Sequence, residues 1–276
     1  MQPQVLCPVE PRPFLKWAGG KGKLISQYSF HFPENCSTYY EPFLGGGAVF
    51  FHLQPQQAFL MDINSELVNV YQCVRDRLSE LIECLKAHRD AHCREHYYQV
   101  RACIPTAAVE RAARLIYLNK TCFNGLYREN SKGQFNVPMG SYKNPGIFDS
   151  ELLIAASRSL QFAQIHQAPF QAVLDYAKTS RDFVYFDPPY FPISSTSNFT
   201  AYNRYTFKQE DHIRLRDTFR TLANRGVKVM LSNSDCPFVR ELYADFRVYT
   251  ISAARAINSK ATCRGKITEL LITSYG

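Results

Sequence analysis

The chain has 276 residues, 46% of them hydrophobic and 20% charged, which suits one large α/β domain or a domain carrying an insertion. No apolar run approaches the length that crosses a bilayer, so we expect no membrane partner. Nine cysteines without a Cys-x-x-Cys pair argue against a structural zinc and predict reduced thiols in the cytoplasm. The net charge of +8 is concentrated in residues 12–23, 120–143 and 255–269, which indicates a polyanionic partner, although a solvated basic face is the alternative.

Residues 14–23 place glycines and lysines before a predicted helix that runs to residue 30. The spacing differs from a phosphate-binding loop, because Trp17 stands five residues before Gly22 and Leu24 follows Lys23 where a hydroxyl should stand. A lysine-bearing surface turn is one interpretation of this stretch. The chain's single tryptophan within it favours a ligand contact.

Residues 38–43 predict a strand, and residues 44–51 predict a glycine turn that enters a helix. Together they indicate the first strand-turn-helix unit of a Rossmann-like sheet. Phe50 replaces the third glycine of the dinucleotide fingerprint, so a nicotinamide or flavin cofactor is not supported. A second predicted strand, residues 58–61, ends at Asp62, which can accept both ribose hydroxyls of an adenosine group or, alternatively, cap the next helix.

Residues 65–89 carry apolar side chains at helical spacing and predict one long helix, and another helix follows Pro105. We interpret both as scaffold. His88, His92 and His96 recur at every fourth residue, the spacing of one helix face. Because ligand-spaced acids are missing beyond Glu95, we predict a solvated face rather than a metal site, and no metal elsewhere.

Residues 120–148 lack helical or strand periodicity and predict a loop with a hairpin. Basic, amide and aromatic side chains alternate along it, as phosphate contacts, base-edge hydrogen bonds and wedging into a base stack require. A long surface loop over ordinary aromatic packing is the alternative. After residue 149 the pattern of alternating helices and strands resumes.

Residues 183–186 predict a buried strand that ends in the corner Asp187-Pro188-Pro189-Tyr190. Proline fixes its own backbone and biases the preceding residue toward an extended conformation, so this corner is stiff. It presents a carboxylate, carbonyl acceptors and a flat ring, which suit a planar amino group that donates two hydrogen bonds while its ring stacks.

The remaining elements complete the predicted sheet. Thr206 and Gln209 predict a capping box that opens a helix to residue 224. Residues 227–232, 246–252 and 269–275 predict three further strands, the last preceded by a basic loop from residue 255 to residue 266.

These motifs, in this order and over nearly the whole chain, resemble the Dam-type DNA adenine methyltransferases. The resemblance is carried by Phe14-Leu15-Lys16-Trp17-Ala18-Gly19-Gly20-Lys21, Glu41-Pro42-Phe43, Ala48-Val49-Phe50, Asp62-Ile63-Asn64-Ser65, Tyr117-Leu118-Asn119, Asn124-Gly125-Leu126, Phe135-Asn136-Val137-Pro138, Asp187-Pro188-Pro189-Tyr190 and Asn198-Phe199-Thr200-Ala201-Tyr202. Ser141 departs from the enterobacterial pattern, which has a basic residue there.

The resemblance implies a Rossmann-like, S-adenosyl-L-methionine-dependent α/β fold with an inserted, mainly helical target-recognition domain that carries a hairpin loop. The expected boundaries are 1–63 and 150–276 for the catalytic domain and 64–149 for the insertion. It further implies a monomeric, cytoplasmic, nucleoid-associated bacterial enzyme that acts on double-stranded DNA at GATC and releases S-adenosyl-L-homocysteine.

The resemblance also implies a set of site residues. The expected catalytic residues are Asp187, Pro188 and Tyr190. The expected cofactor contacts are Trp17, Lys21, Glu41, Phe43, Gly45, Gly47, Asp62, Ile63 and Asp187. The expected DNA contacts are Lys16, Phe123, Asn124, Leu126, Arg128, Asn130, Asn136, Pro138 and Tyr142.

In the predicted mechanism, the Asp187 carboxylate and the Pro188 carbonyl each accept one N–H of the adenine amine, and Tyr190 stacks on the flipped base. Arg128 is predicted to read a guanine, and Phe123 to wedge beside the vacated base. Cytosine N4, RNA adenine or a glutamine side chain could use the same corner. A DNA-binding or regulatory module with a vestigial site is the alternative outside the enzymes.

Overall fold

The computed structural model describes residues 9–193, 207–254 and 266–276. The predicted motif at 198–202 and most of the basic loop at 255–266 lie outside these residues. Within the described part, no helix is both long and apolar enough to span a bilayer.

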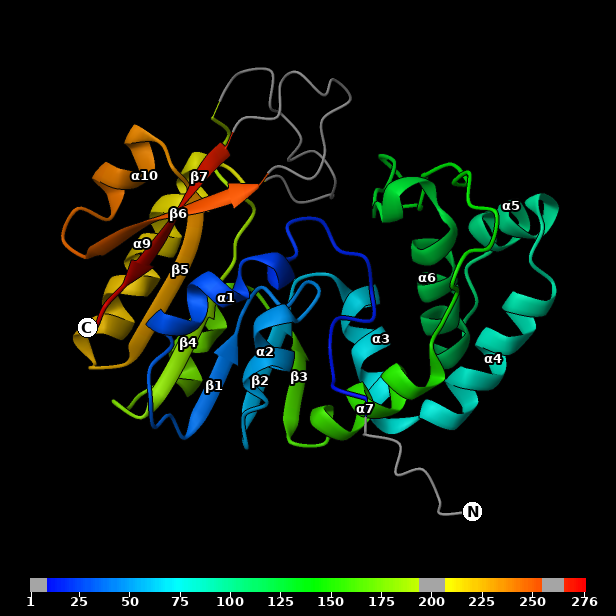
Figure 1. Ribbon diagram of the computed structural model, residues 1–276, viewed down its shortest axis with the longest axis horizontal. Helices are drawn as coiled ribbons and strands as arrows, with labels where there is room; N and C mark the ends of the chain where they lie inside the picture. Colours follow the sequence, from blue (N-terminus) through cyan, green and yellow to red (C-terminus); the bar gives the residue numbers. More distant parts are fainter. Residues whose placement is uncertain (1–8, 194–206, 255–265) are drawn as a thin grey trace, which may run out of the picture. The chain divides into compact units, whose positions relative to one another are not determined.

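The strands form one seven-stranded sheet in the order β3-β2-β1-β4-β5-β7-β6 (Figure 1). Pairing is parallel from β2 through β1 and β4 to β5, whereas β7 runs antiparallel to both β5 and β6. This mixed α/β architecture fits the predicted Rossmann-like fold. The strands are β1 (Thr38–Glu41), β2 (Ala58–Asp62), β3 (Ala163–Gln167), β4 (Asp182–Phe186), β5 (Lys228–Ser234), β6 (Arg247–Ala254) and β7 (Lys266–Thr273).

Most of the α-helices fall close to the predicted segments, but those at residues 94–102 and 237–242 were not predicted, and two other predictions differ as described below. The α-helices are α1 (Ile25–Tyr28), α2 (Ala48–Leu53), α3 (Ser65–Asp76), α4 (Leu78–Asp90), α5 (Arg94–Ala102), α6 (Ala108–Thr121), α7 (Ser150–Leu160), α8 (Val173–Tyr176), α9 (Gln209–Asn224) and α10 (Pro237–Leu242). The short 3-10 turns are η1 (Lys21–Lys23), η2 (Ser29–His31), η3 (Phe123–Gly125) and η4 (Phe170–Ala172).

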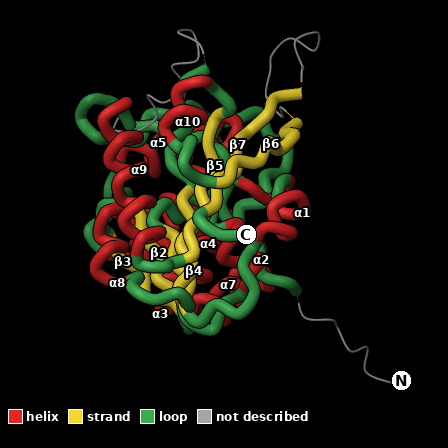
Figure 2. The backbone as a smooth tube through the Cα atoms, turned by 90° about the vertical axis from the view of Figure 1, so that its left-hand side faces the viewer, coloured by secondary structure: helices red, strands yellow, loops and turns green. Residues whose placement is uncertain are grey.

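The chain divides into two compact units. The helical unit comprises residues 1–22, 45–54 and 64–165, and the sheet unit comprises residues 23–44, 55–63 and 166–276. In the sheet unit, α9 packs against β5 and buries Leu215, Phe219 and Leu222 in an apolar core with Val184 and Phe186 of β4 (Figure 2). In the helical unit, α6 packs against α3, α4 and α5.

Two helix predictions were wrong in detail. The expected single helix over 65–89 breaks at Arg77, whose φ of −134° and ψ of 37° are not helical, so α3 and α4 are separate. The helix expected to open with a Thr206–Gln209 capping box instead begins at Gln209. There the Asp211 side chain accepts a hydrogen bond from the Lys208 backbone N–H at 2.7 Å. The apolar spacing continues across Arg77 and therefore does not indicate this break.

The three predicted surface histidines are not a solvated face. His88 stacks on Tyr117 with ring centres 4.9 Å apart, and His92 Nδ1 lies 2.9 Å from the Tyr117 hydroxyl. His88 Nδ1 also lies 3.0 Å from His96 Nε2. Burial, and then the neighbouring His96, lower the pKa of His88 to about 4. The tyrosine of α6 turns this row inward, which helical spacing alone could not indicate.

Candidate active site and DNA interface

The sheet unit reverses its strand order between β1 and β4, because the chain winds from β1 through β2 toward β3 on one side and from β4 to β5 on the other. Ligands of open α/β sheets bind at such a switch point, outside the carboxyl ends of the strands. Tyr40 pairs with Val184 and Glu41 with Leu60. If the same register is continued toward the carboxyl ends, Asp62 and Asp187 both lie opposite Phe43. Each of the two strands that flank β1 therefore leads into an acidic residue at the same edge of the sheet.

Asp187 is held by hydroxyls from two strands. Ser232, at the carboxyl end of β5, donates from Oγ to Asp187 Oδ1 at 2.9 Å, and the Tyr185 hydroxyl lies 2.9 Å from the same Oγ. A carboxylate only accepts, and a serine has one proton to give, so Tyr185 donates to Ser232 and Ser232 donates to Asp187. Burial and the Asp187 charge raise the pKa of Tyr185 well above its usual value, which keeps this donor protonated.

Tyr190 is held by an acid that the sequence analysis missed. Its hydroxyl donates to Glu269 Oε2 of β7 at 2.7 Å, and the Tyr28 hydroxyl of α1 donates to the same oxygen at 3.2 Å. Burial, followed by the Asp187 charge, raises the pKa of Tyr190 well above its usual value. Pro188 is buried and Pro189 exposed, so the corner is rigid on its inner side.

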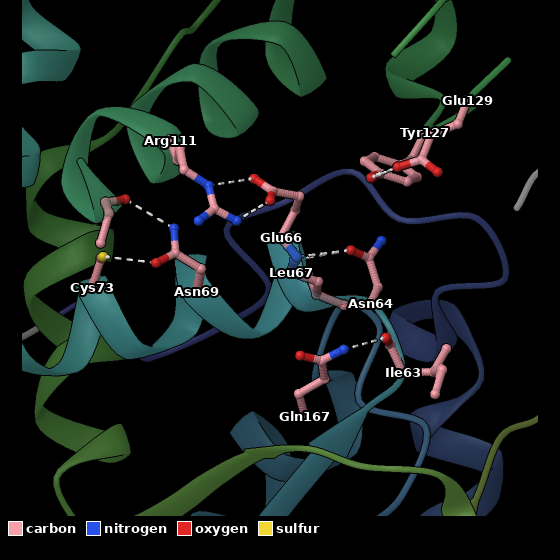
Figure 3. Close-up of polar contacts among 11 residues, drawn as sticks. Ile63, Asn64, Glu66, Leu67, Asn69, Cys73, Arg111, Tyr127, Glu129 and Gln167 are labelled. Carbon is pink, nitrogen blue, oxygen red and sulfur yellow. Dashed lines mark hydrogen bonds and ion pairs between the residues drawn. The ribbon is translucent and has the colours of Figure 1, made fainter. Parts of the chain in front are cut away.

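The other cofactor residues predicted in the sheet unit lie at the same edge. Glu41 ends β1 and is 2% exposed, and Asp62 ends β2. Asn64, not Asp62, caps α3, since its side chain accepts from the backbone N–H groups of residues 66 and 67 (Figure 3). Ile63 is 39% exposed, whereas Phe43 stacks within the core, 5.4 Å from Phe170 between ring centres.

The cofactor residues predicted in the helical unit are Trp17, Lys21, Gly45 and Gly47, of which Gly45 lies against the Trp17 indole. A Cβ atom on Gly45 would lie 2.9 Å from the Trp17 ring, and Gly45 has a φ of +47°, so the indole requires glycine there. Gly47, with a φ of +65°, is the N-cap residue of α2. Lys21 is only 4% exposed, and its Nζ donates to the Gly19 carbonyl at 2.8 Å.

Several predicted DNA contacts gather on one turn of the helical unit. Phe123 is 50% exposed, and its backbone N–H donates to the Pro138 carbonyl at 2.9 Å. Asn124 follows in a left-handed conformation with a φ of +54°. The exposed Lys16 places its Nζ 4.3 Å from the centre of the Tyr142 ring. The ammonium of Lys16, the ring of Phe123 and the amide of Asn124 are therefore all exposed in this part of the helical unit.

Four other predicted DNA contacts, Leu126, Arg128, Asn130 and Asn136, also make contacts within the protein. Arg128 donates from Nε to Asn136 Oδ1 at 2.7 Å and from Nη2 to the Asn136 carbonyl at 3.2 Å. Asn130 Oδ1 accepts from the backbone N–H groups of Lys132 and Gln134, which closes the tip of the loop. Leu126 packs on the apolar cluster beneath the loop. Asn136 thus orients Arg128, and Asn130 shapes the turn.

The base of this loop is tied to the rest of the helical unit. The Tyr127 hydroxyl donates to Glu129 (Figure 3), and its ring stacks on Trp17 with centres 5.4 Å apart. Tyr97 and Arg101 of α5 both donate to the Val137 carbonyl, at 2.9 and 3.2 Å.

Among the residues that the structure describes, no group of three or more His, Cys, Asp and Glu side chains is placed to hold a metal ion.

Comparison with known proteins identifies the family of this chain. The family described as D12 class N6 adenine-specific DNA methyltransferase matches residues 17–257. The chain belongs to this family. It is 46% identical to the type II methyltransferase M1.LlaDCHI of Lactococcus lactis subsp. cremoris over 273 residues, 96% of either chain. It is 36% identical to the DNA adenine methylase of Escherichia coli K12 over 270 residues, 94% of either chain.

The reaction of this family is methylation of adenine N6 in DNA, one of the planar amines considered in the sequence analysis. The sequence analysis missed Ser232, Tyr185, Tyr28 and Glu269 of this methyltransferase. Two signals for them were available in the sequence. One is the polar run that follows the apolar part of β5, and the other is the single acid, Glu269, within the apolar strand β7. Neither signal reveals its partner, because the partner lies far away in the sequence.

Proposed function

We propose that this methyltransferase uses S-adenosyl-L-methionine to methylate an adenine that is flipped out of duplex DNA, with GATC as its site. The observation that carries the proposal is the Asp187 corner, which follows β4 beside the switch point. Its carboxylate is oriented by Ser232 at 2.9 Å. When bound, the cofactor supplies a methyl group on an electron-poor sulfonium.

The residues of the sheet unit suit that cofactor. Asp62, at the end of β2, offers a carboxylate to the two ribose hydroxyls, and the exposed Ile63 offers an apolar surface to the adenine ring. In the helical unit, the buried ammonium of Lys21 is the proposed partner for the carboxylate of the cofactor. The indole of Trp17 is the proposed partner for its adenine ring. Gly45 and Gly47, which both have positive φ, place no side chain on the glycine turn.

The amine is held by the corner in the proposed mechanism. Its lone pair is delocalised into the adenine ring, which makes it a weak nucleophile. If the Asp187 carboxylate and the Pro188 carbonyl each accept one N–H, the nitrogen becomes more tetrahedral and its lone pair is directed at the methyl group. The bond from the nitrogen to the methyl carbon would form as the methyl–sulfur bond breaks, without a covalent enzyme intermediate. S-adenosyl-L-homocysteine would leave, and the methylated nitrogen would lose its surplus proton to water. The protein residues contribute positioning and electrostatics.

Recognition of DNA is proposed for the loop of residues 121–142 within a target-recognition domain over residues 64–149. Arg128, oriented by Asn136, is the candidate reader of guanine O6 and N7. Phe123 is half exposed on its turn and is the candidate wedge beside the flipped base. Tyr190 supplies the ring on which that base stacks.

The proposal is tested with a GATC duplex and S-adenosylmethionine labelled on the methyl group. We expect label on adenine N6 of GATC and a loss of at least about a thousandfold in kcat for Asp187→Asn, since the amine loses its charged acceptor. Asp175→Asn, on the exposed side of α8, is the matched control and should retain full activity. Near-normal turnover by Asp187→Asn would refute the mechanism, and label outside GATC would refute the site.

A further inference from the structure

Asn119 is the buried side chain that joins the Lys16–Trp17 segment to the turn carrying Phe123 and Asn124. It stands in the last turn of α6 and is 1% exposed. Its Oδ1 accepts from the Lys16 backbone N–H at 2.8 Å, and its Nδ2 donates to the Lys16 carbonyl at 2.7 Å. The same Nδ2 donates to the Gly125 carbonyl at 3.1 Å. One amide therefore uses both of its donor hydrogens and its oxygen on two separate segments.

The two segments also touch directly. Gly125 has a φ of +64°, and a Cβ atom there would lie 2.5 Å from Lys16 Cβ, so the close approach requires glycine. The turn has weak bonds of its own, because the N–H groups of Gly125 and Leu126 donate to residues 122 and 123 at 3.3 Å each. Its conformation therefore depends on the Asn119 amide and on the Lys16 backbone.

The indole of Trp17 connects the Lys16–Trp17 segment to the glycine turn. Trp17 lies against Gly45 of the glycine turn and stacks on Tyr127, which follows the Phe123–Gly125 turn. A ligand that restricts the motion of Trp17 also restricts the adjoining Lys16 backbone. Because Asn119 is hydrogen-bonded to both Lys16 and Gly125, the turn then becomes less mobile as well. When one ligand has already ordered a shared segment, the second ligand loses less conformational entropy on binding.

We propose that Asn119 is a positioning residue that couples cofactor binding to DNA binding. The inference rests on the proposed function, in which Trp17 contacts the cofactor and the Phe123–Gly125 turn contacts DNA. Asn119 itself touches neither ligand. Its effect is a coupling free energy, so each ligand must raise the affinity for the other by the same factor.

The experiment measures the dissociation constant of S-adenosyl-L-homocysteine with and without a saturating GATC duplex, and that of the duplex with and without S-adenosyl-L-homocysteine. For the natural chain we expect both ratios to be equal and at least about fivefold. For Asn119→Ala we expect both ratios to fall to within about twofold of unity, while the chain still binds each ligand alone.

Asn69→Ala is the matched control. Asn69 also donates from its side-chain amide to a backbone carbonyl of the helical unit, that of Ala108 at 2.9 Å (Figure 3). Its Oδ1 accepts from Cys73 Sγ, so these side-chain bonds involve neither segment. We expect its coupling ratios to equal those of the natural chain. If Asn69→Ala lost the coupling as fully as Asn119→Ala, a general loosening of the unit would explain both results and the proposal would fail.

A second measurement needs no variant, and so does not depend on Asn119→Ala folding. In the natural chain without DNA, S-adenosyl-L-homocysteine should slow hydrogen exchange of the amides of residues 123–128. Unchanged exchange there, or ratios of unity in the natural chain, would overturn the coupling and leave the proposed function intact. Failure to bind S-adenosyl-L-homocysteine or the GATC duplex at all would overturn both.

Discussion

Ser232→Ala is the sharpest test of how the corner is built. The change removes the donor to Asp187 Oδ1 and the acceptor of the Tyr185 hydroxyl, both at 2.9 Å, and the Ser232 and Tyr185 side chains are fully buried. A hydrogen bond to a charged group contributes about 1.5–3 kcal/mol. If the transition state depends on the Asp187 orientation to that extent, kcat/KM falls by about 10- to 150-fold, since each 1.36 kcal/mol is a factor of ten.

The same substitution also leaves the buried Tyr185 hydroxyl without its Ser232 acceptor. We therefore expect it to lower the free energy of unfolding by about 1–3 kcal/mol. The double variant Ser232→Ala/Tyr185→Phe separates the two effects. It removes that hydroxyl too, so we expect the free energy of unfolding to recover by about 1 kcal/mol or more while kcat/KM stays low. Tyr185→Phe alone keeps the Ser232 donor and should retain activity within about threefold.

The assays are single-turnover methyl transfer to a GATC duplex and urea unfolding of each variant. An activity that recovers together with stability in the double variant would show that Ser232 acts only through folding. Activity of Ser232→Ala within twofold of the natural chain would refute the role of the hydroxyl in orienting Asp187.

Three further predictions concern the acid of β7, a buried histidine and the recognition loop. Glu269→Ala removes the acceptor of the Tyr190 hydroxyl and should lower kcat by about tenfold in the same methyl-transfer assay. Burial lowers the pKa of His212 from 6.5 to about 4, so the unfolded chain binds the extra proton first and stability is lost as pH falls through this window. Between pH 7.5 and pH 5 this histidine should cost about 2 kcal/mol in urea unfolding, a loss absent from His212→Gln. Arg128→Ala should reduce the preference for GATC over singly substituted sites by about 1–3 kcal/mol, and Asn136→Ala should reduce it in the same direction, as measured by kcat/KM on matched duplexes.

The elements that sequence predicts well here are those with local causes. Strands β1, β2 and β4 are apolar runs followed by an acid or a turn, and that pattern needs no knowledge of the fold. The prolines after Asp187 indicate a rigid corner for the same reason. Helix breaks are different, because Arg77 departs from helical geometry while the apolar spacing continues on both sides of it.

The supporting residues could not be predicted because their partners are distant in the chain. Ser232 and Asp187 are 45 residues apart, and Asn119 and Lys16 are 103 apart. The polar run in residues 232–234 is visible in the sequence, yet it would fit any strand end that faces solvent. Only the strand order, which sets β5 beside β4, turns that run into the support of the corner.

The antiparallel strand β7 extends this argument to Tyr190. In the parallel part of the sheet, only residues at the carboxyl end of a strand reach the reactive edge. Strand β7 runs the other way, and Glu269 pairs with Ser234 at the end of β5, so an acid near the start of the last strand also reaches that edge. Glu269 can therefore hold Tyr190 while Ser232 holds Asp187, and the two ends of the Asp-Pro-Pro-Tyr corner are anchored by different strands. Loosening one anchor should then leave the other in place, so Glu269→Ala and Ser232→Ala should lower activity by separate and nearly multiplicative factors.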